Sequence, residues 1–89
     1  MRIDVTARHP QRTVLVTGAS GYVGGRLVTE LLAAGFRVRA SSRRAASLQR
    51  FDWSRRVELV EADLTEPEDV ARIMAGVDIA FYLVHSMGD

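Results

Sequence analysis

The stretch that decides the fold runs from Thr13 to Gly35 and reads TVLVTGASGYVGGRLVTELLAAG. Its first five residues are apolar or β-branched, which is typical of a strand buried on both faces of a parallel sheet. From Tyr22 to Ala34 the apolar residues recur at helical spacing, and Gly35 supplies a left-handed stop. The stretch therefore predicts a buried strand, a glycine-rich turn and a helix in direct succession.

The turn between this strand and this helix has the pattern G-x-x-G-x-x-G, with glycines at positions 18, 21 and 24. Gly18 allows the chain to reverse tightly, and Gly24 allows the helix to pack closely on the strand. Because Gly21 has no Cβ, a pyrophosphate can approach the N–H groups of the helix start, where the Ser20 hydroxyl adds a donor. In this context the pattern predicts a dinucleotide site. The G-K-[ST] of a P-loop is missing, so nucleoside triphosphate hydrolysis is not supported.

The rest of the chain continues to alternate strands with helices. Further strands are expected over residues 37–41, 57–61 and 77–84. We expect a short helix over 45–52 and a longer one that starts with Thr65 as its cap, has Pro67 in its first turn and ends at Gly76. Such alternation predicts right-handed crossovers. The predicted fold class is α/β, a Rossmann-type parallel sheet of order 3-2-1-4 with flanking helices and an incomplete second half.

The length of 89 residues is small for one domain and too short for two. We expect residues 1–12 to form a flexible leader and residues 13–89 to be the N-terminal part of a dinucleotide-binding Rossmann domain in a larger protein. The half over which the nicotinamide and the substrate lie would then be missing, so no catalytic residue is expected here. The apolar edge of the last strand favours self-association through that strand.

The composition excludes several classes of protein and site. The chain has no cysteine, so it can form neither disulfides nor thiolate metal sites, and no lysine, which excludes a Tyr-x-x-x-Lys catalytic pair. No apolar run reaches the ~18 residues of a membrane span, and no secretory signal is present, so we expect a cytoplasmic protein with no membrane contact. Residues 1–56 hold eleven arginines and three acidic residues, whereas residues 57–89 hold one arginine and eight acidic residues. Few aromatic residues lie among the arginines, so nucleic-acid binding is not expected.

The residues after the second predicted strand indicate which dinucleotide binds. In NAD-selective sites an acidic residue roughly 20 positions past the glycine turn holds the adenosine ribose. This chain has no acidic residue between Glu30 and Asp52, and its second predicted strand instead ends in Ser41, Ser42, Arg43 and Arg44. Hydroxyl and guanidinium donors suit a 2′-phosphate, although an arginine in a polar turn is often simply solvated. The sequence therefore favours NADP(H) over NAD(H), with Arg43 as the main contact and Arg44 as a second one.

Two further positions follow predicted strands at the edge where open α/β sheets bind ligands. Asp63 and Leu64 come after the third strand, where the Asp63 carboxylate either accepts from the adenine amino group or caps the following turn. Val84, His85 and Ser86 come after the fourth strand. We expect His85 to line the cofactor rather than to act as an acid or base, although most lone histidines in loops do neither.

Three segments of the chain, 13–43, 57–70 and 77–88, together resemble the N-terminal portion of the short-chain dehydrogenase/reductase superfamily. They are most similar to its atypical, NmrA-like branch, for which the ending YLVHSMG is typical. The resemblance implies an NADP-binding Rossmann fold in which six residues lie at the phosphates: Gly18, Ser20, Gly21, Tyr22, Val23 and Gly24. It also implies Arg43 at the 2′-phosphate, Asp63 and Leu64 at the adenine, and residues 84–86 near the ribose.

Two functions from different classes use all of these residues. One is the cofactor-binding half of an NADP(H)-dependent oxidoreductase, in which the superfamily's catalytic Tyr-x-x-x-Lys would lie beyond residue 89. The other is a non-catalytic NADP(H)-binding redox sensor or scaffold. The sequence leaves both open.

Overall fold

The sheet has four parallel strands in the order β3-β2-β1-β4, as the sequence predicts. The computed structural model of the protein describes residues 12–83. In it β1 (Thr13–Thr17) lies between β2 (Arg37–Ser42) and β4 (Ile79–Tyr82), and β3 (Glu58–Glu61) pairs with the outer side of β2. The outer edge of β4 pairs with no strand among the described residues, so self-association through this edge stays a prediction.

The register of the strands brings their carboxyl ends to one edge of the sheet. Thr17, the last residue of β1, lies opposite Ser41 of β2 and Tyr82 of β4. Ser42, the last residue of β2, lies opposite Glu61 of β3. The glycine turn after β1 therefore opens at the same edge as the loops that follow β2 and β3.

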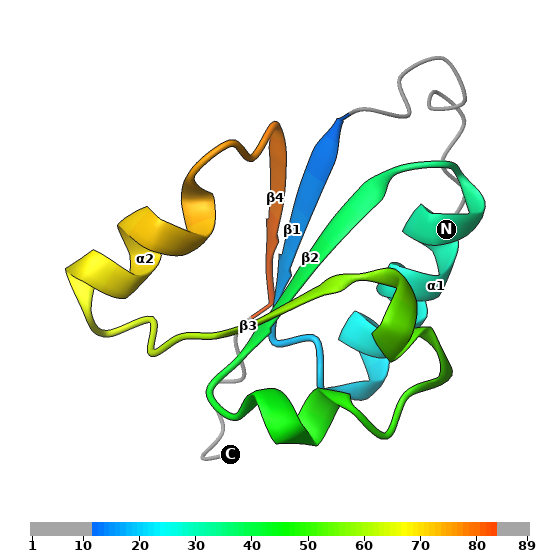
Figure 1. The fold of residues 1–89 in the computed structure, drawn as a ribbon, viewed down its shortest axis with the longest axis horizontal. Coiled ribbons are helices and arrows are strands. Elements are labelled where there is room, and N and C mark those ends of the chain that lie inside the picture. The colour runs from blue at the N-terminus through cyan, green and yellow to red at the C-terminus, as the bar shows by residue number, and fades with distance from the viewer. Residues whose placement is uncertain (1–11, 84–89) are drawn as a thin grey trace.

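Helices cover both faces of the sheet because β1 alternates its side chains between two cores. Val16 belongs to the core cluster under α1 (Tyr22–Ala33), whereas Leu15 packs on the opposite face with Ile73 of α2 (Pro67–Met74). All three of these side chains are buried. Figure 1 shows α1 and α2 on opposite sides of the sheet. In the part of the chain that the structure describes, no helix has the length and apolar character to cross a bilayer.

The prediction of a single helix over residues 45–52 is wrong. The chain forms two 3₁₀ helices instead, η2 (Ala45–Leu48) and η3 (Asp52–Arg56). Phe51 and Trp53 both pack into the core cluster under α1, and residues two apart lie on opposite sides of an α-helix. Two tight turns allow both rings to face the same core.

The start of α2 also differs from the prediction. Thr65 does not cap this helix: its N-cap residue is Glu66, which makes no side-chain capping bond, and Pro67 is the first helical residue. The Thr65 hydroxyl donates instead to the Asp63 carboxylate. β4 begins at Ile79, two residues later than predicted. Val84, the last residue of the predicted strand, lies outside the described residues, as do residues 1–11 of the leader predicted over 1–12.

Candidate functional site

Two of the three glycines in the turn after β1 are required by close packing of the backbone. Gly18 has a φ of +69°, and a Cβ there would collide with the carbonyl oxygen of Leu83. A Cβ at Gly24 would collide with the Gly18 carbonyl oxygen and lie 2.8 Å from the Cα of Ala19. Gly21 has a φ of −80° and a ψ of 171°, which any residue can adopt. The backbone conformation therefore does not explain why position 21 has no side chain.

The first turn of α1 presents backbone donors that its own helix cannot satisfy. The N–H groups of Tyr22, Val23 and Gly24 have no intrahelical acceptor, and the N-cap residue Gly21 has no side chain to cap them. This turn contains no acidic residue. The Tyr22 side chain is 79% exposed and that of Val23 63% exposed, so the helix start is open to solvent. Such a helix end favours an anion.

A hollow of about 670 Å³ opens at the carboxyl edge of the sheet, beside this helix start. Eight residues that the sequence singled out line it: Gly18, Ser20, Ser41, Ser42, Arg43, Arg44, Asp63 and Leu64. Loops that follow three different strands thus contribute to one cavity. Its lining combines polar side chains, which can bind a phosphate, with the apolar side chain of Leu64. This mixture suits a nucleotide.

The remaining predicted residues fall outside this lining. Gly21, Tyr22, Val23 and Gly24 belong to the adjacent start of α1. Val84 and His85 lie outside the described residues. Sequence reasoning missed four residues that line the hollow: Ser47, Ala62, Thr65 and Leu83. Ala62 and Leu83 directly follow a strand, and that position was the signal that could have found these two.

Ser42 takes part in a hydrogen-bond network that orders the turn after β2. The Ser47 hydroxyl donates to the Arg44 carbonyl oxygen at 2.7 Å. The Ser42 hydroxyl lies 3.1 Å from that of Ser47, and because the Ser47 proton is already used, Ser42 is the donor in this pair. Ser42 also accepts from the Arg44 N–H at 3.4 Å. Direct donation from Ser42 to a phosphate stays a prediction and requires the bond to Ser47 to open.

The Asp63 carboxylate caps the turn that follows β3, which is one of the two roles expected from the sequence. Its Oδ1 accepts from the Thr65 hydroxyl at 2.6 Å and from the Thr65 N–H at 2.9 Å. These bonds stabilise the charged form and hold the pKa of Asp63 below its ordinary value, with a smaller contribution from the charge of Arg43. Asp63 is therefore a carboxylate at neutral pH. Acceptance from an adenine amino group stays a prediction.

Asp69 fixes the same turn from the side of α2. Its Oδ2 accepts from the Asp63 N–H at 2.8 Å, and its Oδ1 accepts from the Arg72 guanidinium at 3.1 Å. These two bonds lower the pKa of the Asp69 carboxyl, the Asp63 N–H more than Arg72. The wall of the hollow formed by residues 62–65 is thus tied to the first turn of α2.

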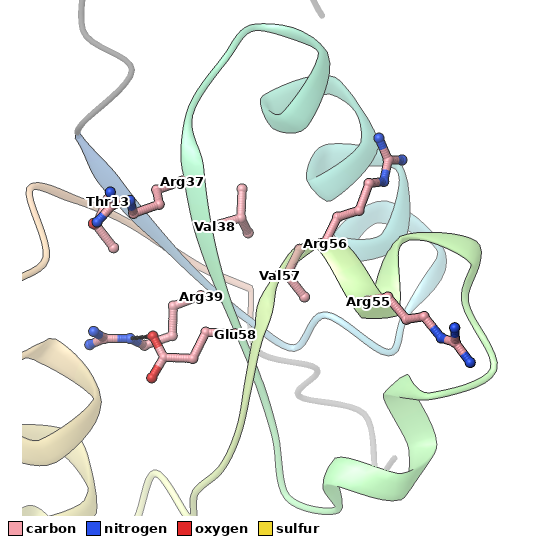
Figure 2. A pocket seen from close by; sticks show the side chains of 8 residues that line it. All are labelled: Thr13, Arg37, Val38, Arg39, Arg55, Arg56, Val57 and Glu58. Atoms are coloured by element: carbon pink, nitrogen blue, oxygen red, sulfur yellow. Dashed lines mark hydrogen bonds and ion pairs between the residues drawn. The ribbon is translucent and has the colours of Figure 1, made fainter.

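Another hollow, of about 400 Å³, lies at the opposite edge of the sheet and is lined by arginines. Figure 2 shows that the side chains of Arg55 and Arg56 point away from it rather than toward a common point. Arg39 is engaged already: its Nε pairs with the Glu58 carboxylate at 2.8 Å, and its Nη1 donates to the carbonyl oxygens of two residues at the end of α2. These arginines do not converge on a ligand, so the carboxyl edge is the stronger candidate.

Comparisons with known proteins agree with this location. The chain matches the family described as NAD(P)H-binding over residues 18–89. A 3-beta-hydroxysteroid dehydrogenase of Mycolicibacterium neoaurum is 42% identical over 79 residues, which are 89% of this chain and 21% of that protein. A solved short-chain dehydrogenase/reductase superfamily protein from Agrobacterium tumefaciens with bound NAD superposes with a TM-score of 0.70 at 27% identity, over 86% of this chain and 21% of its own. MoeE5, solved in complex with UDP-glucose and NAD, has a TM-score of 0.62 and 31% identity over 80% and 21% of the two chains.

The chain spans about a fifth of the length of the curated relatives it matches. The family match extends over most of the chain and includes the glycine turn, β2, β3 and β4. The fold and the relatives agree with the resemblance seen in the sequence. The chain therefore belongs to the NAD(P)H-binding family and has the Rossmann-type fold of the short-chain dehydrogenases/reductases.

Proposed function

We propose that this chain binds NADP(H) in preference to NAD(H), as the cofactor-binding part of an oxidoreductase. One observation carries the proposal: Arg43 and Arg44 line the same hollow as Gly18 and Ser20 of the glycine turn. Both arginine side chains are exposed at the end of β2. A guanidinium binds a phosphate through charge-assisted hydrogen bonds, and a carboxylate at this position would repel it.

The cofactor is distributed over the hollow by the chemistry of its parts. The pyrophosphate takes the turn and helix start, made by Gly18, Ser20, Gly21, Tyr22, Val23 and Gly24. Ser42, Arg43 and Arg44 hold the 2′-phosphate, and Asp63 and Leu64 hold the adenine. Val84 and His85, which lie outside the described residues, take the ribose side in this proposal.

The oxidoreductase part of the proposal is supported by the relatives. Besides the steroid dehydrogenase, a 2-alkyl-3-oxoalkanoate reductase of Shewanella oneidensis is 36% identical over 82% of this chain. When bound, the nicotinamide cofactor supplies a hydride acceptor or donor, and the task of this chain is to bind and orient it. The two solved neighbours hold NAD rather than NADP, so the preference for NADP(H) depends on this chain's own arginines.

The test is a pair of titrations of the protein, with NADPH and with NADH, followed by the fluorescence of the reduced nicotinamide. We expect NADPH to bind at least about tenfold more tightly, because hydrogen bonds to charged groups contribute about 1.5–3 kcal/mol each. Arg43→Ala should remove most of this difference and leave the affinity for NADH nearly unchanged.

Arg37→Ala is the matched control. Arg37 is also exposed on β2, but it lies at the amino end of the strand, away from the hollow. It should change neither affinity. Equal or tighter binding of NADH by the unchanged protein would overturn the proposed preference.

A further inference from the structure

Arg50 reaches the glycine turn from a distant part of the sequence. Its Nη2 donates to the carbonyl oxygen of Ser20 at 3.3 Å, across 30 residues. Ser20 lines the hollow at the carboxyl edge of the sheet together with Arg43 and Arg44. The Arg50 guanidinium therefore contacts a residue that lines the hollow, although Arg50 does not itself belong to the lining and nothing in the spacing of the sequence indicates this contact.

The Arg50 side chain rests on an aromatic platform that belongs to the core. The carbon of its guanidinium lies 4.8 Å from the centroid of the Phe51 ring. The Phe51 ring stacks on that of Trp53, with centroids 4.7 Å apart and an angle of 6° between the planes, and Trp53 is buried. Phe51 is also held from the side of α1, since a Cβ at Gly25 would lie 3.2 Å from its ring. The cation is thus ordered before any ligand binds, which lowers the entropic cost of using it.

The bond from Arg50 to Ser20 also changes the electrostatics of the turn. A bare carbonyl oxygen beside a phosphate would repel it, and the guanidinium covers the Ser20 oxygen with positive charge. A guanidinium has several N–H donors in one plane, so the bond to Ser20 leaves others for a phosphate oxygen. Among the described residues, the ion pairs are Arg39–Glu58 and Arg72–Asp69, and neither uses Arg50.

We propose that Arg50 is a further specificity-determining residue of the site, which binds the 2′-phosphate of the cofactor's adenosine together with Arg43. This inference rests on the proposed preference for NADP(H). Arg50 lies in the connection between η2 and η3, whereas the sequence indicated 2′-phosphate contacts only in the turn after β2. The ligand class it recognises is a 2′-phosphorylated adenosine.

The test compares two ligands that differ only in the 2′-phosphate, adenosine 2′,5′-bisphosphate and adenosine 5′-monophosphate, by calorimetric titration of the protein. Arg50→Ala should weaken the bisphosphate about fivefold or more and change the monophosphate less than about twofold. Arg50→Lys keeps the charge but not the planar fork and should lose only part of the affinity. Arg56→Ala, at an exposed arginine of η3 outside the hollow, is the matched control and should change neither.

Equal weakening of both ligands by Arg50→Ala would overturn the inference, because it would mean that Arg50 only orders the turn through Ser20. An unchanged affinity for both would overturn it as well. The proposed preference for NADP(H) would fail in a different way: the unchanged protein would then bind the bisphosphate no more tightly than the monophosphate. If Arg43→Ala abolishes that preference and Arg50→Ala does not, only the inference about Arg50 is wrong. If Arg50→Ala does not fold, Arg50→Lys and Arg50→Gln give the same comparison of ligands.

Discussion

The buried hydroxyl of Thr17 accepts a hydrogen bond from the backbone N–H of Leu83 at 3.0 Å. The same hydroxyl donates to the carbonyl oxygen of Phe81 at 3.4 Å. Thr17 therefore joins the end of β1 to the end of β4 on the side of the sheet where the hollow opens. Its neighbour Gly18 is packed against the Leu83 carbonyl, so both contacts fix the position of the glycine turn.

Thr17→Val should destabilise the protein, although the side chain keeps its shape. The change leaves the Leu83 N–H without its acceptor, and an unpaired buried donor costs about 1–3 kcal/mol. The free energy of unfolding, measured with urea, is the readout. Thr29→Val is the matched control, because among the described residues the Thr29 hydroxyl bonds only to the Gly25 carbonyl of its own helix. We expect it to change stability by less than about 0.5 kcal/mol. A Thr17→Val protein as stable as the unchanged one would contradict the role of this bond.

Gly24→Ala should be far more damaging than Gly25→Ala. A methyl group at position 24 meets the backbone of Gly18 and Ala19, which cannot move without displacing the glycine turn. Overpacking of this kind costs about 3 kcal/mol, and affinity for the dinucleotide should fall with it. At position 25 the methyl group meets the ring of Phe51, and the better helix propensity of alanine offsets about 1 kcal/mol of the cost. Thermal unfolding measures the melting temperatures of the two variants, and Gly24→Ala should melt at the lower temperature. Equal melting temperatures would contradict this prediction.

Arg39→Met should loosen α2 from the sheet. The Arg39 guanidinium donates to the carbonyl oxygens of Ile73 at 2.7 Å and Ala75 at 2.8 Å, at the end of that helix. The loss of these bonds should cost about 2 kcal/mol, whereas the pair with the exposed Glu58 contributes little. Faster hydrogen exchange in α2 would locate the effect. Arg37→Met, at an exposed position of the same strand, is the control and should exchange as the unchanged protein does.

Acid should weaken the turn formed by residues 63–69. The folded state lowers the pKa of both Asp63 and Asp69, so each contributes stability that is complete above its ordinary pKa. That stability is lost as the pH falls through the lower pKa of the folded protein. The free energy of unfolding should therefore decrease as the pH drops below about 4.

Thr65→Ala tests the cause of the Asp63 shift. Removal of the hydroxyl that donates to Oδ1 should raise the pKa of Asp63 toward its ordinary value. An NMR titration of the Asp63 carboxyl carbon measures this directly. Thr65→Ser keeps the hydroxyl and should keep the low pKa. A serine variant that shifts as far as the alanine variant would mean that the hydroxyl is not the cause.

Much of the fold could be predicted because its signals are local. The run from Thr13 to Thr17 is apolar enough to require burial, and the alternation of strands and helices predicts a parallel sheet with right-handed crossovers. The order of the strands was expected from the resemblance to the short-chain dehydrogenases/reductases. The 3₁₀ helices could not be predicted in this way, because Phe51 and Trp53 are placed by the core that receives them. Threonine is a common helix-capping residue, but the Thr65 hydroxyl bonds to the Asp63 carboxylate instead of capping α2.

The sequence by itself determined the strand, glycine turn and helix, and the polar turn with two arginines after β2, since each depends on neighbours within a few residues. Only the tertiary structure decided that the loops after three strands share one hollow and that Arg50 lies against Ser20. It also decided that Arg39 closes the end of α2. These contacts join residues about 30 or more positions apart, and their existence depends on how far a side chain reaches once the strands are in register. Such a distance is a property of the packed chain, and no spacing along the sequence encodes it.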